Sequence, residues 1–339
     1  MPLKKKISKN HPDILYGKTG VLIINLGTPE ATDWMSIRKY LKEFLSDRRI
    51  IEVNRILWFL ILNLIILTFR PSKTSKAYKE IWMESINKSP LRYYSENLTE
   101  KVASKFNKEK VIVSLAMRYG KPSINEKISY LQKQGCEKII ALPLYPQYAA
   151  ATSASVCDEI FRTFLKMRWQ PSLQIIHHYC SHDYYISALA DSIKKKLTSL
   201  NWTPDLIIAS YHGIPKRYFL SGDPYHCYCH KTTRLIREKL RSNIPISTCF
   251  QSRFGPEEWL TPYTDKTLQE LPRNKTTKVL LICPGFSCDC IETLEEIEIR
   301  AKDDFMKNGG KKFAYVNCLN DDKKHVRLIE NLIRKYLIQ

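Results

Sequence analysis

The residues best suited to chemistry in this chain are one histidine and a short run of carboxylates. His212 directly follows the apolar stretch Leu206–Ala209, and Gly213 and Pro215 end that stretch. An imidazole changes its charge near neutral pH, so His212 can act as a general base or as a metal ligand. A single histidine at the end of a strand can equally be an ordinary hydrogen-bonded loop residue. The histidine alone therefore leaves both interpretations open.

The carboxylates follow a second apolar stretch, Val279–Cys283, where a helix is predicted to begin. Asp289 is expected as the N-cap of that helix and Glu292 as its third residue, the arrangement called a capping box. This structural role accounts for Glu292 but not for Glu296, which would lie one turn further on the same face. Like charges four residues apart cost roughly 0.2–0.5 kcal/mol. The pair Glu292 and Glu296 therefore indicates a functional role, such as the binding of metal ions or the transfer of protons.

Eight short apolar stretches, with helical patterns between them, must position these side chains. Buried parallel strands have continuous apolar sequences of this kind. The first four are Val21–Leu26, Val111–Leu115, Lys138–Leu144 and Leu173–His177, and the second four are Leu206–Ala209, Ile244–Phe250, Val279–Cys283 and Phe313–Val316. Amphipathic stretches between them include Ser123–Gln134 and Tyr184–Leu197. The pattern predicts an α/β fold of two similar Rossmann-like halves, each a mostly four-stranded parallel sheet flanked by helices.

The expected domains follow from this division. We expect a basic tail over residues 1–16, an N-terminal half over 17–185, a C-terminal half over 186–322 and a closing helix over 323–339. Sheets of this class bind ligands beyond the carboxyl ends of their strands. His212 and the carboxylates both lie at such ends in the second half, where they can face one cleft.

One segment departs from the alternating pattern. Ile56–Phe69 is an uncharged run of 14 residues between Arg55 and Arg70. As a helix it would measure about 21 Å, short of the roughly 20 residues that cross a bilayer. It is either a buried core helix or an exposed apolar lip that enters a membrane surface or flanks a large apolar ligand.

Composition restricts the setting of the protein. Among the 339 residues, 54 are Lys or Arg and 34 are Asp or Glu, a net charge of +20 that favours an anionic partner. Ten cysteines are too few for a disulfide scaffold, and the first residues carry no apolar signal segment, so we expect reduced thiols in the cytoplasm. No dinucleotide fingerprint or P-loop is present, and no basic–aromatic module indicates nucleic-acid binding.

Several segments taken together resemble the ferrochelatases, from about residue 18 to 335. The matching segments are Asn25–Glu30, Tyr40–Asp47, Ala116–Gly120, Leu144–Tyr148, Tyr211–Pro215, Gly222–Tyr225, Phe250–Gly255, Trp259–Pro262 and Phe286–Glu296. Each segment alone is a weak signal, but their order and spacing are highly specific. The resemblance implies that Fe²⁺ is inserted into a porphyrin, expected to be protoporphyrin IX, held between the two halves.

The resemblance also implies roles for individual residues. It assigns His212 and Glu292 to catalysis and metal contact, and Asp289 and Glu296 to a path for protons or metal. The porphyrin would be lined by Leu26, Arg118, Tyr119, Trp259 and Phe286, with a propionate held by Arg70, Tyr78 and Ser89. The run Ile56–Phe69 matches an apolar lip, which predicts peripheral association with the inner membrane.

The cysteines leave one question open. Some ferrochelatases hold a [2Fe–2S] cluster on C-terminal cysteines, but the last cysteine here, Cys318, is isolated. We therefore expect no tightly bound cofactor, with Fe²⁺ as substrate. The cluster His226–His230 and the pair Cys288 and Cys290 remain an alternative ligand set. Eukaryotic relatives have histidine at the position of Cys290, which leaves a metal role for that thiol undecided.

Three other functions compete with iron insertion. A chelatase for cobalt or nickel is one, although such relatives carry extra histidines in place of the acidic run Glu292–Glu296. A porphyrin or haem carrier without activity is another, but it would need neither His212 nor Glu292. A nucleic-acid binder is the third, suggested by net charge alone. The sequence does not distinguish protoporphyrin from coproporphyrin as substrate.

Overall fold

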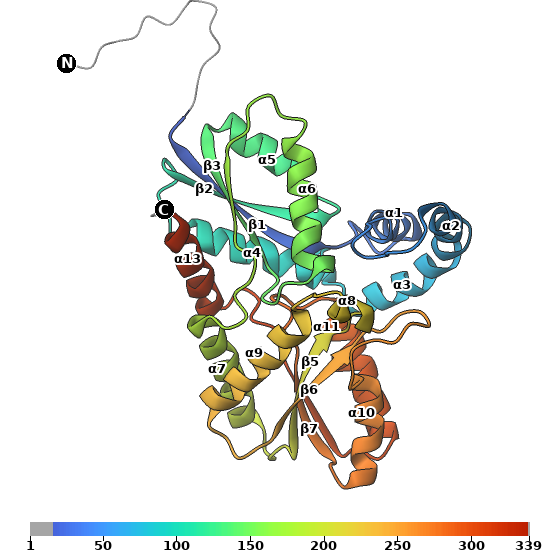
Figure 1. The fold of residues 1–339 in the computed structure, drawn as a ribbon. Coiled ribbons are helices and arrows are strands. Elements are labelled where there is room, and N and C mark those ends of the chain that lie inside the picture. Colours follow the sequence, from blue (N-terminus) through green and yellow to red (C-terminus); the bar gives the residue numbers. More distant parts are fainter. Residues whose placement is uncertain (1–15, 338–339) are drawn as a thin grey trace, which may run out of the picture.

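The computed structural model describes residues 16–337 and contains two four-stranded sheets in which every strand is parallel to its neighbours. The first has the order β2-β1-β3-β4 and the second the order β6-β5-β7-β8, so the two halves repeat one topology (Figure 1). The strands are β1 (Lys18–Gly27), β2 (Val111–Tyr119), β3 (Cys136–Pro143), β4 (Ser172–Ile175), β5 (Leu206–His212), β6 (Ile246–Gln251), β7 (Lys278–Ile282) and β8 (Lys312–Val316). All eight predicted strands and the predicted fold class are confirmed.

Helices connect and cover the strands in both halves. The first half contains α1 (Trp34–Leu45), α2 (Arg55–Leu60), η1 (Ile61–Ile66), α3 (Leu67–Ile81), η2 (Glu84–Ile86), α4 (Pro90–Ala103), α5 (Ile124–Lys133), η3 (Ala150–Ala154) and α6 (Ser155–Phe164). After these come α7 (Asp183–Ser199), α8 (Lys216–Leu220), α9 (Tyr225–Leu240), α10 (Thr264–Glu270), η4 (Leu271–Asn274), α11 (Ile291–Thr293), η5 (Leu294–Ala301), α12 (Lys302–Lys307) and α13 (Lys323–Leu337). Of the predicted basic tail, only Tyr16 belongs to the described residues.

Alternation along β1 explains how one strand serves two cores. Val21 and Ile23 face a central core that also contains Ile207 and Leu280 of the second sheet, whereas Leu22 and Ile24 face α5 and α6. Successive side chains of a strand point to opposite faces, and parallel strands are buried on both. The central core therefore joins the two halves into one body.

The C-terminal helix α13 reinforces that connection. Leu328, Ile329 and Ile333 are buried in the central core, and Arg334 donates to the Lys105 carbonyl at 3.0 Å. The helix thus returns from the second half to pack on the first, where a closing helix is predicted. Its last residues lie beside the strands of the first half in Figure 1.

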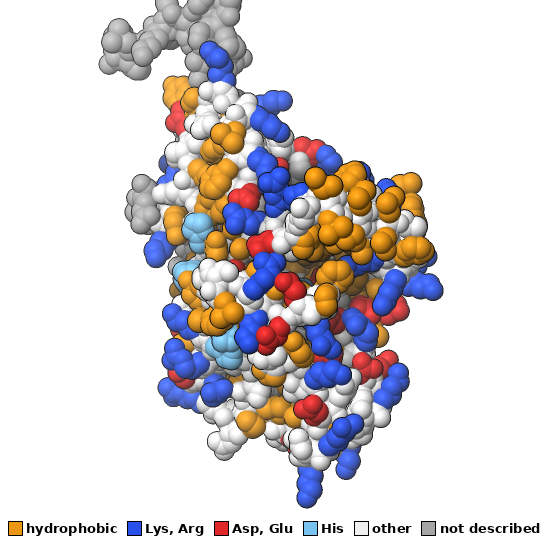
Figure 2. Space-filling model, turned by 45° about the vertical axis from the view of Figure 1, so that its right-hand side comes forward, with side chains coloured by type: hydrophobic (Ala, Val, Ile, Leu, Met, Phe, Trp, Pro, Cys, Tyr) orange, Lys and Arg blue, Asp and Glu red, His pale blue; other side chains and the backbone are white. Residues whose placement is uncertain are grey.

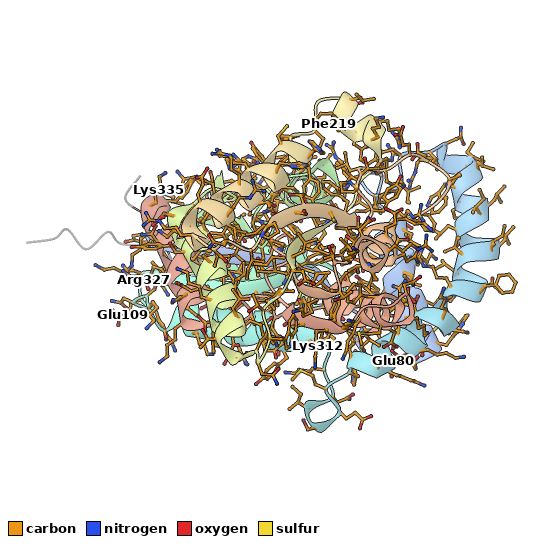
Figure 3. All side chains as sticks on the ribbon, turned by 90° about the horizontal axis from the view of Figure 1, so that it is seen from below. Glu80, Glu109, Phe219, Lys312, Arg327 and Lys335 are labelled. Carbon is orange, nitrogen blue, oxygen red and sulfur yellow. The ribbon has the colours of Figure 1, made fainter. Side chains whose placement is uncertain are left out.

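The apolar run forms part of a long helix whose outer face is uncovered. Trp58, Leu62 and Leu67 pack against α1, whereas the opposite side exposes large apolar side chains. The exposed set comprises Ile56, Leu57, Phe59, Leu60, Leu64, Ile65 and Phe69, which we call the lip surface. Figure 2 shows these apolar side chains gathered on one lobe, and Figure 3 shows the helix at the edge of the molecule with side chains projecting outward.

By length and composition, the continuous helix Arg55–Ile81 could cross a membrane. One such helix is weak evidence for a span, and here the buried side of the helix is part of the protein interior. Tyr78 and Ile81, near its end, are buried and line the pocket described next. The helix thus connects an exposed apolar surface to an internal wall.

Candidate active site

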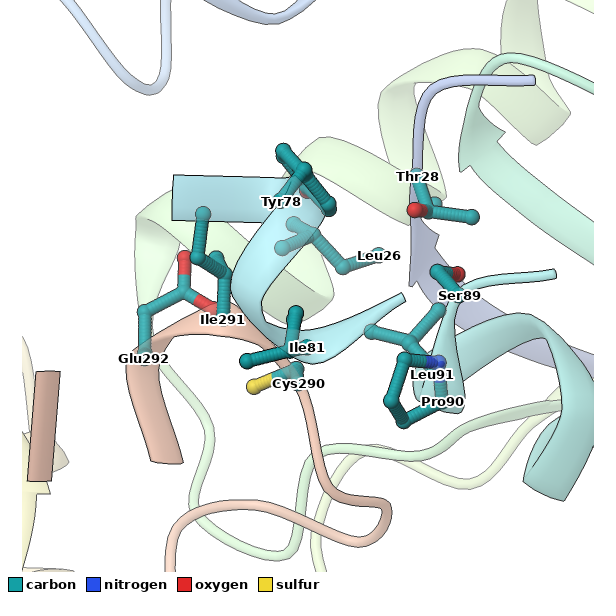
Figure 4. Close-up of a pocket in the computed structure, with 11 residues that line it drawn as sticks. Leu26, Thr28, Tyr78, Ile81, Ser89, Pro90, Leu91, Cys290, Ile291 and Glu292 are labelled. Atoms are coloured by element: carbon teal, nitrogen blue, oxygen red, sulfur yellow. The ribbon is translucent and has the colours of Figure 1, made fainter. Parts of the chain in front are cut away.

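The carboxyl ends of the two sheets meet at a narrow pocket (Figure 4). It is lined by Leu26, Gly27, Thr28, Tyr78, Ile81, Ser89, Pro90, Leu91, Cys290, Ile291 and Glu292. These residues come from the end of β1, from α3, from the start of α4 and from the segment after β7. The free space is about 10 Å³, close to that of a single water molecule. A large flat ligand therefore requires the walls to separate.

His212 ends β5 and has one ring nitrogen already committed. Its Nδ1 lies 2.7 Å from the carbonyl oxygen of Gly213, and a carbonyl only accepts, so Nδ1 carries the proton. In its neutral form the ring therefore presents Nε2 with a free lone pair, as a base or ligand requires. The Trp259 ring lies beside it at 6.4 Å between centroids. A Cβ at Gly213 would come within 3.0 Å of the Gln251 carbonyl, so this close approach requires glycine.

The predicted capping box at the carboxylate run is wrong. The N-cap of α11 is Cys290, whose backbone N–H donates to Thr293 Oγ1 at 2.9 Å, and Glu292 is the second helical residue. Asp289 is buried one residue before the N-cap, where the carboxylate must be satisfied by hydrogen bonds. It accepts from Tyr315 Oη and Asn320 Nδ2, each at 2.7 Å. This network draws Asp289 away from the capping position and leaves the Glu292 side chain without a capping role.

The helix carrying Glu296 also differs from the predicted α-helix. Residues Leu294–Ala301 form the π-helix η5, a form that is frequent at functional sites. Ser252, after β6, holds Glu296 through its backbone N–H at 2.9 Å and its hydroxyl at 2.6 Å. Gln251 Nε2 donates to the backbone carbonyl of Glu292 at 2.8 Å. The end of β6 therefore anchors the carboxylate run beside β5, the strand that His212 ends.

Electrostatics connects these groups. Burial raises the pKa of Glu296, while hydrogen bonding from Ser252 and the charge of His212 oppose that rise and the charge of Glu292 adds to it. His212, at the end of β5, and Glu292, after β7, therefore both act electrostatically on Glu296. An imidazole with a free nitrogen that interacts with a carboxylate can accept protons and pass them on.

Two of the three propionate candidates, Tyr78 and Ser89, line the pocket. Burial and the charge of Glu292 raise the pKa of Tyr78 far above its ordinary value, so its hydroxyl stays protonated and can donate. Ser89 caps α4 by accepting from the backbone N–H of Arg92 at 3.2 Å, which leaves its own proton free. The Arg70 guanidinium lies 5.0 Å from the Phe254 ring, and burial lowers its pKa against the opposing effect of Glu292. Arg70 does not line the narrow pocket itself.

Comparison with known proteins decides the family. The ferrochelatase family model matches residues 18–337. The chain belongs to the ferrochelatase family. A ferrochelatase of Allorhizobium ampelinum strain S4 is 52% identical over 333 residues, covering 98% of this chain and 97% of the relative. A ferrochelatase of Francisella tularensis subsp. novicida strain U112 is 49% identical over 323 residues, covering 94% and 96%.

Solved structures agree on the fold. SirB from Bacillus subtilis with Fe³⁺ superposes with a TM-score of 0.58 at 12% identity, covering 94% of this chain and 95% of that one. CbiX, described as the terminal enzyme of sirohaem biosynthesis in denitrifying bacteria, has a TM-score of 0.51 at 10% identity, covering 93% and 98%. At these identities the likeness shows the two-half chelatase fold alone. The family makes the chain a ferrochelatase, a lyase of haem biosynthesis.

Two residues that the family resemblance places on the porphyrin lie in a different polar network. The Arg118 guanidinium pairs with Asp47 and donates to Ser155 Oγ at 2.7 Å, and the Tyr119 hydroxyl donates to Asp47 at 2.8 Å. All of these groups are buried. Arg118 also borders a separate polar cavity of about 490 Å³ together with Arg48, Arg55 and Arg162. A direct porphyrin contact by this pair remains a prediction for this ferrochelatase.

The remaining wall candidates are closer to the site. Leu26 lines the narrow pocket, and Phe286, in the loop after β7, is half-buried against the apolar cores on both faces of the second sheet. Trp259 has its indole N–H buried, with no hydrogen-bond partner within residues 16–337. Such a donor next to His212 is available to a ligand.

Sequence reasoning did not single out Thr28, Gln251 or Ser252, and it left the role of Cys290 open. Gln251 and Ser252 anchor the carboxylate run, and Thr28 and Cys290 line the pocket. Gln251, Ser252, Thr28 and Cys290 all lie inside segments that match the family, but each has an ordinary polar side chain. Only the pairing of distant strand ends brings them together at the site.

The cysteines of the alternative ligand set are divided between two places. Cys227 is exposed and Cys229 buried on α9, whereas Cys288 and Cys290 are buried in the segment before α11. Within the described part of the chain, no group of three or more His, Cys, Asp or Glu side chains has the geometry to hold a metal ion.

Proposed function

We propose that this ferrochelatase inserts Fe²⁺ into protoporphyrin IX to form protohaem with release of two protons, and that His212 and Glu292 carry the reaction. The observation that supports this most directly is the free Nε2 of His212 at the end of β5, on a residue whose charge acts on the Glu296 carboxylate. A free-base porphyrin loses two pyrrole protons as the metal enters, so a base must stand at the macrocycle centre. One imidazole with carboxylates also holds Fe²⁺ loosely enough to release it, unlike a closed thiolate site.

We assign the steps as follows. His212 Nε2 accepts a pyrrole proton, and the proton passes to Glu292 and along Glu296. The same carboxylates stabilise the positively charged imidazolium that forms when His212 accepts the proton. This stabilisation favours the first proton transfer. The porphyrin ring loses two protons and gains one Fe²⁺, so the total charge is conserved. Wall residues such as Leu26 and Phe286 favour the puckered ring that exposes the nitrogen lone pairs.

Propionate binding is assigned to donors around the pocket. The Tyr78 and Ser89 hydroxyls lie on the pocket wall, and Arg70 supplies a cation that is partly removed from water. Hydrogen bonds from a charged donor to a carboxylate are about twice as strong as neutral ones. These groups bind the porphyrin without taking part in the proton transfer.

Two variants test the assignment. His212→Ala should lower kcat by roughly 10²–10⁴-fold or more while porphyrin binding, measured by fluorescence quenching, stays close to wild type. Glu292→Gln should fold normally and lose most of kcat, because Glu292 does not cap its helix and its charge is what matters. The exposed carboxylate Asp303 on α12 provides the matched control, Asp303→Asn.

The outcomes separate the alternatives. Normal iron insertion by His212→Ala would exclude the mechanism, and normal activity of Glu292→Gln would exclude that residue. A protein that binds porphyrin but inserts no metal would be a carrier. Parallel anaerobic assays with protoporphyrin IX and coproporphyrin, each with Fe²⁺ or Co²⁺, identify the substrate pair by its absorption spectrum.

We propose further that the protein is cytoplasmic and binds peripherally to the inner membrane through the lip surface. Seven large apolar side chains are exposed on the helix that begins at Arg55, in a protein of net charge +20. Apolar insertion combined with cationic attraction gives reversible binding to anionic lipid. The same helix reaches the pocket at Tyr78, so a poorly soluble porphyrin could pass from lipid to the site. We propose no nucleic-acid partner.

We also propose that the protein holds no iron–sulfur cluster. The support is the division of its two Cys-x-Cys pairs between α9 and the segment before α11. Protein purified anaerobically should lack absorption bands between 400 and 600 nm. About two irons and two sulfides per chain would contradict this proposal.

A further inference from the structure

Two histidines on α9 form a pair that the proposed catalysis does not use. His226 and His230 are one helical turn apart, and their ring centroids lie 4.4 Å from each other with the ring planes at 50°. Residues four apart on a helix share one face. His226 is half-buried and His230 is exposed, so the pair opens to solvent. Two histidines at this spacing are the helical arrangement that binds zinc in metalloproteases.

Aromatic side chains hold the pair in place. The His226 ring lies 4.9 Å from the Phe219 ring and stacks on Phe250 at 5.9 Å with an interplanar angle of 19°. His230 lies 6.1 Å from the same Phe250 ring. Phe250 is buried, and Phe219 lies on α8 at the surface in Figure 3. Because the rings are already restrained, a ligand that bridges them loses little side-chain entropy.

The nitrogens of both rings are available. His212 and His325 each have a ring nitrogen bonded to a backbone carbonyl, but His226 and His230 make no such bond within residues 16–337. Burial lowers the pKa of both, and the neighbouring His226 lowers that of His230 further. Neutral imidazole is the form that coordinates metals. The pair therefore presents lone pairs at neutral pH.

The pair is separated from the catalytic centre by the second sheet. Phe250 and Gln251 are successive residues of β6 and point to opposite faces. Phe250 contacts the histidines on the side of α9, whereas Gln251 reaches the backbone of Glu292. A metal at the histidines would therefore not share ligands with His212.

We propose that His226 and His230 form a second metal site, for a borderline divalent cation such as Zn²⁺ or Ni²⁺. Metal–imidazole bonds of roughly 2.0–2.1 Å place two ligating nitrogens at most about 4 Å apart. With the ring centroids 4.4 Å apart, a nitrogen of each ring can come within that distance. No described group supplies three protein ligands, so water completes the coordination. Zn²⁺ and Ni²⁺ exceed Fe²⁺ in affinity for such ligands. The site therefore selects against the substrate iron.

Zinc binding tests this proposal in a His212→Ala background, which removes the proposed catalytic ligand. Isothermal titration of the purified full chain with Zn²⁺ should show one site per chain. His226→Gln and His230→Gln should each weaken that site by at least about tenfold, since either change removes half of the protein ligands. His178→Gln, which removes an exposed imidazole near α9, and Cys227→Ser, which removes the exposed thiol on the same turn, should leave binding unchanged.

Thermal unfolding of each variant confirms that the fold is retained. Absence of zinc binding in the His212→Ala background would overturn the proposal. So would equal binding by wild-type and histidine-pair variants, or loss of binding in Cys227→Ser with retention in His226→Gln. Absorption of bound Co²⁺ gives an independent readout, because visible bands should disappear in His226→Gln and persist in His178→Gln.

Discussion

Ser252 holds both carboxylate oxygens of Glu296, one through its backbone N–H at 2.9 Å and the other through its hydroxyl at 2.6 Å. Ser252 adopts a left-handed backbone conformation with φ at 63°, which aims the N–H and the hydroxyl at the same side chain. Glu296 is thereby fixed in the π-helix that carries the proposed proton path. The two residues are 44 positions apart in sequence, so this contact depends on the pairing of β5 with β6 and β7.

Ser252→Ala should lower kcat with little change in the KM for porphyrin. A hydrogen bond to a charged group contributes roughly 1.5–3 kcal/mol, a factor of about ten to a hundred. Since the lost hydroxyl normally lowers the pKa of Glu296, that pKa should rise further and move the acidic limb of the pH–rate profile upward. Ser252→Gly, which tolerates the positive φ, controls for backbone strain. Restored activity in Ser252→Gly would assign the effect to strain rather than to the hydroxyl.

Asp289→Asn should be mainly a stability defect. The buried carboxylate accepts five hydrogen bonds, from Tyr315, Asn320, Thr293, Asn317 and the Cys318 backbone. In this variant an NH₂ group, which cannot accept, would replace one carboxylate oxygen and face hydrogen-bond donors. Each donor left unsatisfied costs about 1–3 kcal/mol. We expect a lower Tm in thermal unfolding, against an unchanged Tm for Asp303→Asn. A normal Tm with lost activity would instead favour the proton-path role implied by the family resemblance.

Acid should destabilise the fold through His325. Burial lowers its pKa from 6.5 to about 4, so the unfolded chain binds this proton more readily than the folded one. Stability is therefore lost as pH falls from about 6.5 towards 4, by up to about 3 kcal/mol, and the loss levels off below 4. Chemical denaturation across this pH range measures it. His325→Gln, which can still donate to the Asn320 carbonyl, should flatten the pH dependence, whereas His177→Gln, at an exposed histidine, should not. Equal slopes in all three proteins would exclude His325.

Serine substitutions on the lip surface should release the protein from lipid. Phe59, Leu60 and Leu64 are exposed on one helix, and each large apolar side chain gains about 1.5–3 kcal/mol on leaving water. The triple change to Ser should reduce co-sedimentation with anionic vesicles by more than about tenfold. Leu165 and Leu220 are exposed on other elements, so Leu165→Ser with Leu220→Ser is the matched control. Unchanged sedimentation of the lip variant would show that this surface does not contact lipid.

The fold class and the location of the site could be predicted from sequence because both rest on local signals. Continuous apolar stretches such as Val21–Leu26 identify buried parallel strands, and residues after such strands lie at ligand-binding edges. His212 was found in this way. The ordered motifs carried the family assignment, which the relatives confirm.

The capping of α11 shows why local rules failed at the carboxylates. Asp289 followed by Glu292 satisfies the sequence pattern of a capping box, but Tyr315 and Asn320, from beyond β7, take the Asp289 carboxylate. A buried carboxylate has lost its hydration and must be satisfied by hydrogen bonds from the protein. The five hydrogen bonds to Asp289 therefore stabilise the protein more than a single helix cap would. The helix start moves by one residue, and Glu292 becomes free for chemistry.

By itself, the sequence determined that this protein has two parallel sheets, a histidine and carboxylates at strand ends, an apolar run near residue 60 and the motifs of a ferrochelatase. Only the tertiary structure decided that Ser252 donates hydrogen bonds to Glu296 and that one side of the apolar run is exposed. It also decided that the rings of His226 and His230 lie together on α9. The pattern that identifies a strand depends on residues that are neighbours along the chain, so it can be recognised in the sequence. Exposure, ring contacts and hydrogen-bond partners depend on residues that only folding brings together.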